Sequence, residues 1–186
     1  MTLLIAGLAL FLGIHMLPTF ASAREGLIDK WGEKKYKGLF SLVSAVGLGL
    51  IIWGFATREM VEVFEPPTWG RTLALAVMPF VFILMTAPDM GANNIKRITK
   101  HPMMLGTLLW AAVHLANNGD MGSVILFSGF LAYAILDMIS ATARGKVPRY
   151  EPQPITKDIV VVVVGLVGYG VFMYWLHDWL IGVPVV

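Results

Sequence analysis

Long apolar stretches separated by short polar segments make up almost the whole chain. Most are close to the length of about 20 residues that a helix needs to cross the hydrocarbon layer of a bilayer. The stretches cover residues 2–22, 39–57, 71–90, 102–117, 122–142 and 158–182. No period-two alternation of the barrel type runs through them. The pattern therefore predicts an all-α, polytopic integral membrane helical bundle of about six transmembrane helices.

Local signals mark the ends of two stretches. Pro102 suits the first position of a helix, and the run Asn117–Asp120 is typical of a helix end. Near the N-terminus, Ala21-Ser22-Ala23 has the small residues of a signal-peptide cleavage site. No positive charge precedes Arg24, however, and the apolar run is long for a signal peptide. We therefore interpret residues 2–22 as the first membrane helix.

Composition agrees with this assignment. The 186 residues are 57% hydrophobic and only 14% charged, whereas soluble domains carry about 25% charged residues. This length predicts a single transmembrane domain over residues 1–186. The net charge of +2, with no basic run interleaved with aromatics outside the loops, argues against nucleic acid as a partner. The absence of cysteine excludes disulfides and thiolate metal sites.

Basic residues are concentrated in alternate loops. Twelve of the 14 lie in the segments 23–38, 91–101 and 143–157. Because cytoplasmic loops of membrane proteins carry an excess of Lys and Arg, these three loops are expected on the cytoplasmic side and both termini outside it. Pro148, Pro152 and Pro154 predict that the third loop is extended.

Ionisable groups inside membrane spans are costly and are therefore candidate functional residues. At about 1.5 Å per helical residue, His15 would lie roughly 12 Å and His114 roughly 18 Å from the cytoplasmic surface. The two side chains could meet near the middle of the membrane. They would then be either axial ligands of a haem iron or hydrogen-bonded packing residues. For His177 we expect an interfacial role, and for Asp137 a basic partner at its helix end.

One helix stripe surrounds His114. Every fourth residue belongs to it: Pro102, Gly106, Trp110, His114 and Asn118. Gly106 leaves room for the approach of another group, and Trp110 adds a flat aromatic surface one turn before the histidine. Gly106 and Trp110 are therefore candidate cofactor-binding residues.

A second candidate site lies at the cytoplasmic start of the same helix. His101 stands beside Arg97 and Lys100, and the free backbone amides of a helix N-terminus favour anions. The expected ligand is a haem propionate or a lipid head group. The alternative is that these charges only anchor the helix on the cytoplasmic side.

The chain resembles the NnrU family of bacterial membrane proteins. The resemblance runs over about residues 5–145 and is carried by these segments: Gly13-Ile14-His15, Trp31-Gly32-Glu33, Tyr36–Ser44, Arg97–Gly106 and Trp110–Asp120. It implies a location in the bacterial inner membrane. Together with the distribution of basic residues, this predicts that both termini are periplasmic. The family name is tied to nitric oxide and nitrite metabolism, and so to denitrification.

The NnrU family is similar to the zeta-carotene isomerases. In those enzymes membrane histidines bind a b-type haem that serves cis–trans isomerisation of a carotenoid. The resemblance implies that His15 and His114 are the haem ligands here. The isomerases have a cysteine three residues before the second histidine, where this chain has Ala111. That change preserves haem binding but removes redox-linked ligand exchange.

A second resemblance gives another alternative. Arg97, His101-Pro102 and Gly106 are similar to the entry of the S-adenosylmethionine site in membrane methyltransferases of the isoprenylcysteine type. Those enzymes carry a later Glu pair, whereas this chain reads Asp137–Arg144 in that region. The function hypotheses are thus a haem protein of nitrogen-oxide metabolism, an isomerase of a lipophilic polyene and a methyltransferase. The expected partners are the lipid bilayer and either nitric oxide or a lipophilic small molecule.

Overall fold

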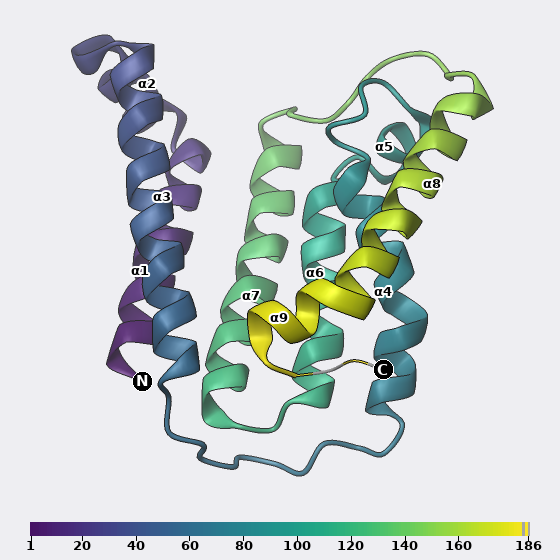
Figure 1. Ribbon diagram of the computed structural model, residues 1–186. Helices are drawn as coiled ribbons and strands as arrows, with labels where there is room; N and C mark the ends of the chain where they lie inside the picture. Colours follow the sequence, from purple (N-terminus) through teal and green to yellow (C-terminus); the bar gives the residue numbers. More distant parts are fainter. Residues whose placement is uncertain (184, 186) are drawn as a thin grey trace.

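The computed structural model describes residues 1–183 and residue 185, and among these it contains helices and loops but no β-strand (Figure 1). The elements are α1 (Thr2–Met16), the 3₁₀ turn η1 (Leu17–Thr19), α2 (Ala21–Trp31), α3 (Glu33–Ala56), α4 (Gly70–Thr86), α5 (Asn94–Thr99), α6 (Pro102–Asn117), α7 (Met121–Ala143), α8 (Ile155–Val171), the π-helical turn η2 (Phe172–Leu176) and α9 (His177–Ile181). The predicted all-helical class is confirmed.

The long helices alternate in direction. In Figure 1, α1, α4 and α7 run upward, and α3, α6 and α8 run downward. The short helices α2 and α5 lie at the upper end with the loop that joins α7 to α8. Both termini lie toward the other end. The three segments rich in basic residues therefore gather at one end of the bundle.

Four helical segments are long and apolar enough to cross a membrane. They are Thr2–Thr19, Glu33–Ala56, Met121–Ala143 and Ile155–Ile181. Large apolar side chains on them stay exposed, such as Trp53 on α3 and Val167 on α8. Such surfaces suit lipid rather than water, and the chain is a membrane protein. Helices α4 and α6 have 17 and 16 residues, fewer than the about 20 of a full span.

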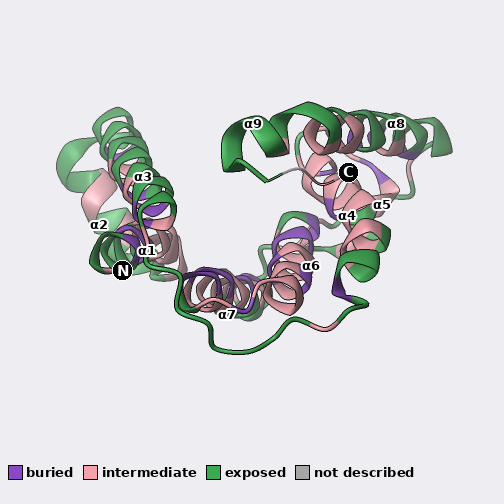
Figure 2. Ribbon diagram, turned by 60° about the horizontal axis from the view of Figure 1, so that its bottom comes forward, coloured by how far each residue is buried: buried purple, intermediate pink, exposed green. Residues whose placement is uncertain are grey.

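The helices form an open arc rather than a closed bundle (Figure 2). Helix α3 packs on α1, α1 on α7, α7 on α6, α6 on α4, and α4 on α8. The largest buried cluster sits between α1, α3, α6 and α7: Leu4, Leu8, Ile51, Ala111, Leu126 and Phe127. Within the described residues, the α1–α3 pair contacts the remaining helices mainly through α7.

Glycines allow α1 and α3 to approach closely. A Cβ at Gly7 would lie 2.6 Å from the backbone nitrogen of Ile51, and one at Gly47 would lie 2.8 Å from that of Phe11. A Cβ at Gly54 would likewise overlap the backbone of Leu4. Small residues at such contacts are typical of helix packing in lipid. Gly49, two residues after Gly47 and so on the other side of α3, faces open space.

Two predicted boundaries near the N-terminus are wrong. The first stretch was expected to be helical to residue 22, but α1 ends at Met16 and η1 separates it from α2. Pro18 lies in this turn and lacks the amide hydrogen needed to continue the helix. Helix α3 begins at Glu33 rather than at residue 39, because Gly32 breaks the chain at φ 78° and the polar segment that follows is helical.

The last predicted stretch, 158–182, corresponds to a helical segment over Ile155–Ile181 that contains a π-helical turn. Helix α8 begins at Ile155, directly after Pro154, and is followed by η2 and α9. The expected extended loop is confirmed over most of its length, because no helix lies between Ala143 and Ile155. The fourth stretch is confirmed at both ends, since α6 spans Pro102–Asn117.

Candidate functional site

His15 lies in the last turn of α1, half-buried among aromatic rings. Its Nδ1 is 2.6 Å from the Phe11 carbonyl oxygen one turn earlier. The ring centroid lies 4.3 Å from that of Phe11 and 5.1 Å from that of Phe40 on α3. Tyr133 on α7 stands edge-on to it at 6.3 Å. The imidazole thus sits where α1, α3 and α7 meet.

His114, like His15, lies near the C-terminal end of its helix, α6. It lies in the last turn, with Nδ1 2.8 Å from the Trp110 carbonyl oxygen. Its ring packs against Trp110 at 5.3 Å and against Phe127 of α7 at 5.0 Å. The side chain is half-buried at the α6–α7 contact.

Both histidines are held in the same tautomer. A carbonyl oxygen only accepts hydrogen bonds, so Nδ1 of His15 and of His114 must carry the donated hydrogen. In the neutral ring Nε2 then has a free lone pair, and among the described residues no hydrogen-bond partner occupies it. Metal-ligating histidines typically show this arrangement, because a bond from the second nitrogen fixes the tautomer and the ring orientation.

The structure does not bring His15 and His114 into direct ring contact. Phe11 lies 5.9 Å from Phe130, and Phe130 lies 5.4 Å from Trp110, so a chain of rings connects the two sites. Their neighbours on α7, Tyr133 and Phe127, are six residues apart, or about 9 Å along the helix. Imidazole nitrogens bind a metal at about 2 Å. Shared ligation of one iron therefore needs a shift from this arrangement and stays a prediction.

The predicted stripe on α6 serves two interfaces. Gly106 faces α4, where an added Cβ would lie 3.0 Å from Cγ of Met85 and 3.3 Å from the carbonyl oxygen of Val81. The group that approaches this glycine is thus a neighbouring helix. Trp110 faces α7, with its ring 5.1 Å from that of Phe127. Of the stripe residues, Trp110 and His114 both pack against the ring of Phe127 on α7.

Arg97 and His101 have different hydrogen-bond partners. Nε2 of His101 lies 2.8 Å from Oγ1 of Thr142 at the end of α7. Nε of Arg97 instead donates to Oδ1 of Asn94, 3.4 Å away within α5. His101 borders an open hollow of about 330 Å³ that Arg97 does not line. The basic side chains of that hollow are Lys96, Lys100, His101 and Lys146, and its one acid is Asp137.

Sequence reasoning missed a polar network that holds α5 and the adjoining loop. The Asp158 carboxylate accepts from Nδ2 of Asn94 at 2.6 Å and from the Ile95 amide at 3.0 Å. Asn93 is fully buried, and the Tyr150 hydroxyl donates to its carbonyl oxygen at 2.8 Å. An acid in the first turn after Pro154 was the available signal, since such residues favour helix N-termini. These contacts fix the loop structure.

His177 is a second residue whose position sequence reasoning missed. It follows η2, and π-helical turns are frequent at functional sites. Its Nδ1 lies 2.7 Å from the Val183 carbonyl oxygen, so it holds the same tautomer as His15 and His114. Its ring lies 5.8 Å from that of Phe172.

Among the described residues, no three His, Asp or Glu side chains gather closely enough to hold a bare metal ion. In comparisons with known proteins, the profile of the family described as NnrU protein matches residues 3–185. No curated protein and no solved structure shows significant similarity to the chain.

Proposed function

The chain belongs to the NnrU family, and we propose that it is an integral membrane haem protein in which His114 is an axial ligand of b-type haem. The observation that supports this most directly is the tautomer of His114. Its Nδ1 hydrogen is held by the Trp110 carbonyl oxygen, and its Nε2 lone pair is left for a ligand. The donor type and the apolar, aromatic surroundings fit an iron porphyrin.

The second axial ligand is His15, as the family resemblance implies. His15 has the same bond to a backbone carbonyl and the same aromatic surroundings. His177 is the competing candidate, because its Nδ1 is likewise held by a backbone carbonyl oxygen, which leaves Nε2 for a ligand. Trp110 offers a flat surface beside the ligand, and the basic groups around His101 suit propionates.

Bound haem would supply a redox-active iron, and nitric oxide could bind it in place of one of the two histidines. The residues of this chain would hold the haem in lipid, set the imidazole orientation and exclude water from the iron. This role fits a sensor or accessory protein of nitrogen-oxide metabolism in the bacterial inner membrane. In this topology α1, α3, α4, α6, α7 and α8 all cross, and the end that carries α2 and α5 is cytoplasmic. The distribution of basic residues supports that orientation.

A polyene isomerase is the second candidate, supported by the open arc of helices with its apolar surfaces (Figure 2). The methyltransferase alternative is less well supported, because Arg97 and His101 contact different partners.

The proposal is tested by purifying the protein from haem-replete cells. A Soret band with the spectrum of low-spin b-type haem is expected. His101→Ala should keep the low-spin spectrum, because Nε2 of His101 is bonded to Thr142, but should retain haem less well, because this histidine belongs to the proposed propionate site. A colourless wild-type protein would overturn the proposal.

A further inference from the structure

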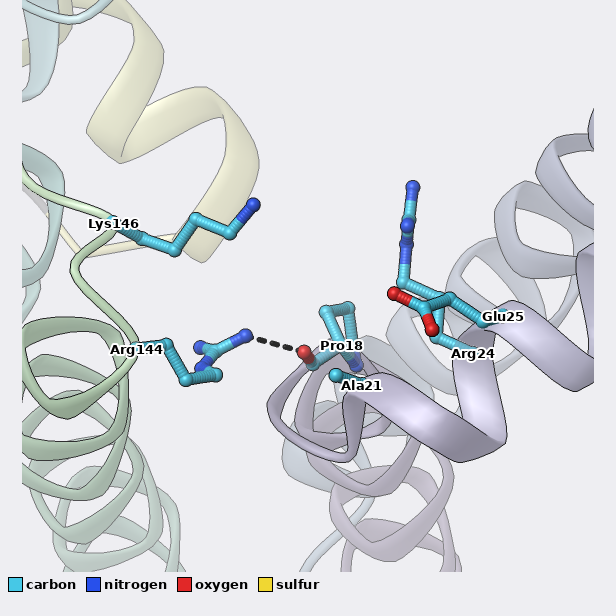
Figure 3. Close-up of a pocket in the computed structure, with 6 residues that line it drawn as sticks. All are labelled: Pro18, Ala21, Arg24, Glu25, Arg144 and Lys146. Carbon is cyan, nitrogen blue, oxygen red and sulfur yellow. Dashed lines mark hydrogen bonds between the residues drawn. The ribbon is translucent and has the colours of Figure 1, made fainter.

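An open hollow of about 530 Å³ lies where the end of α1 and the start of α2 face the end of α7 (Figure 3). Its lining consists of Pro18, Ala21, Arg24, Glu25, Arg144 and Lys146. Three of these side chains are cationic and one is anionic. The hollow therefore carries a net positive charge next to the bases of two membrane helices.

Arg144 is the fixed cation of this hollow. One of its Nη atoms donates to the Pro18 carbonyl oxygen, shown by the dashed line in Figure 3. Its Nε donates to the Ser140 carbonyl oxygen at 3.2 Å. These bonds tie the end of α7 to the turn after α1. They also hold the guanidinium beside the hollow, and its remaining N–H groups can donate to a ligand.

Arg24 and Lys146 rise from opposite sides of the hollow in Figure 3. The Arg24 guanidinium lies 5.7 Å from the ring centre of Tyr36. The Lys146 ammonium makes no hydrogen bond or ion pair within the described part of the chain. Both groups can therefore turn toward an anion without breaking a hydrogen bond.

The position of the hollow matches the depth of lipid head groups. It lies at the end of the bundle where the basic segments gather, immediately beyond α1 and α7. Helix α2 starts after the exposed Phe20 and ends at the exposed Trp31, and aromatic residues are enriched at the membrane interface. A ligand at this depth would come from the bilayer surface.

We propose that this hollow binds the phosphate group of an anionic phospholipid. Arg24, Arg144 and Lys146 would contact the phosphate, and the acyl chains would lie in the bilayer beside α1 and α7. Guanidinium groups bind phosphate oxygens in pairs, and anionic lipids attract basic groups at this surface. The lipid would add to the contacts that join the α1–α3 pair to α7. This site is independent of the proposed haem.

The test uses the full-length protein, stripped of lipid in detergent, and measures lipid binding by native mass spectrometry. The probes are phosphatidylglycerol, phosphatidylcholine and inorganic phosphate. We expect phosphatidylglycerol to bind at least tenfold more tightly than phosphatidylcholine. Arg24→Gln and Lys146→Gln should each weaken phosphatidylglycerol about fivefold, the effect of one charge near such a head group. The matched control, Lys35→Gln, removes an exposed charge outside the hollow and should leave binding unchanged.

Lys146 also lines the hollow beside His101, whereas Arg24 does not. A loss with Lys146→Gln but not with Arg24→Gln would place the lipid in the other hollow and overturn the proposal. An equal loss with Lys35→Gln would mean non-specific attraction and would also overturn it. Competition by inorganic phosphate at the same concentration as the lipid would assign the site to a free anion instead.

Discussion

Arg58 and Asp120 form a two-point ion pair that joins the end of α3 to the start of α7. Nε of Arg58 lies 2.7 Å from Oδ1 of Asp120, and Nη2 lies 3.2 Å from Oδ2. The side chains are only 14% and 10% exposed. The Arg58 guanidinium also stacks 3.5 Å from the ring centre of Phe55. The pair fastens the α1–α3 unit to the other helices at the end opposite the Arg144–Pro18 bond.

Arg58→Met should lower the free energy of unfolding by about 3 kcal/mol, because it leaves a largely buried carboxylate without its partner. Asp120→Asn should cost less, since an amide oxygen can still cap α7 at Ser123. The exposed pair Lys37–Glu33 gives the control: Lys37→Ala should leave stability nearly unchanged, because solvent screens this pair. Thermal unfolding in detergent measures all three. Equal effects of Arg58→Met and Lys37→Ala would contradict this account.

The same pair predicts a pH dependence. Burial opposes ionisation of Asp120, but hydrogen bonds from Arg58 and Ser123 outweigh it and hold the pKa of the carboxyl well below its usual range. A lowered pKa in the folded state stabilises the protein fully above the unfolded pKa of about 3.9, and this stabilisation is lost as the pH falls below that value. Wild-type stability should therefore fall below about pH 4. The acid-dependent loss should be smaller in Asp120→Asn.

The α1–α3 contact predicts opposite effects for two glycines of the same helix. Gly54→Ala should destabilise by about 2 kcal/mol, because the new methyl group meets the backbone of Leu4 and over-packing has costs of this size. Gly49→Ala should be neutral or stabilise by up to about 1 kcal/mol, since its Cβ meets open space and alanine favours the helix. The melting temperatures of the two variants test whether their stabilities differ in this way. Similar temperatures would mean that α1 and α3 are not this close.

The identity of the second axial ligand can be read from the spin state of the iron. If His15 is the ligand, His15→Ala should convert low-spin ferric haem to high-spin, while His177→Ala leaves the signal unchanged. Electron paramagnetic resonance separates the two forms. The reverse pattern would assign the ligand to His177.

The arrangement of basic segments predicts the topology. A C-terminal alkaline phosphatase fusion should be active and a C-terminal fluorescent-protein fusion dark, because both termini are expected in the periplasm. A phosphatase fused after Lys146, in the loop between α7 and α8, should be inactive. Crossing by α4 and α6, the two shorter helices, is tested by a phosphatase fused after Lys100, in the segment between them. That fusion should be inactive, and activity there would show that α4 and α6 do not both cross.

Features that are set by residues close together in the sequence could be predicted from it. The ends of α6 were correct because Pro102 and Asn117 act on the backbone within one turn. Pro18 carried a similar signal, but the apolar run around it masked the end of α1. Gly32 was likewise a visible break before α3.

Features that depend on which helices become neighbours could not be predicted. The contact of His177 with the Val183 carbonyl oxygen depends on the course of the chain after α9. Gly106 was taken as room for a cofactor, and only the packing of α4 against α6 reveals what it faces. The partners of Arg97 and His101, which are Asn94 and Thr142, come from different helices.

The central claim is that Nε2 of His114 ligates haem iron, and the most direct measurement is the haem content of His114→Ala with and without added imidazole. Removing the side chain leaves a cavity beside Trp110 and Phe127 that free imidazole can enter. The account predicts that His114→Ala loses the low-spin Soret spectrum and that imidazole restores it. A variant that keeps the wild-type haem content and spectrum without imidazole would contradict the account.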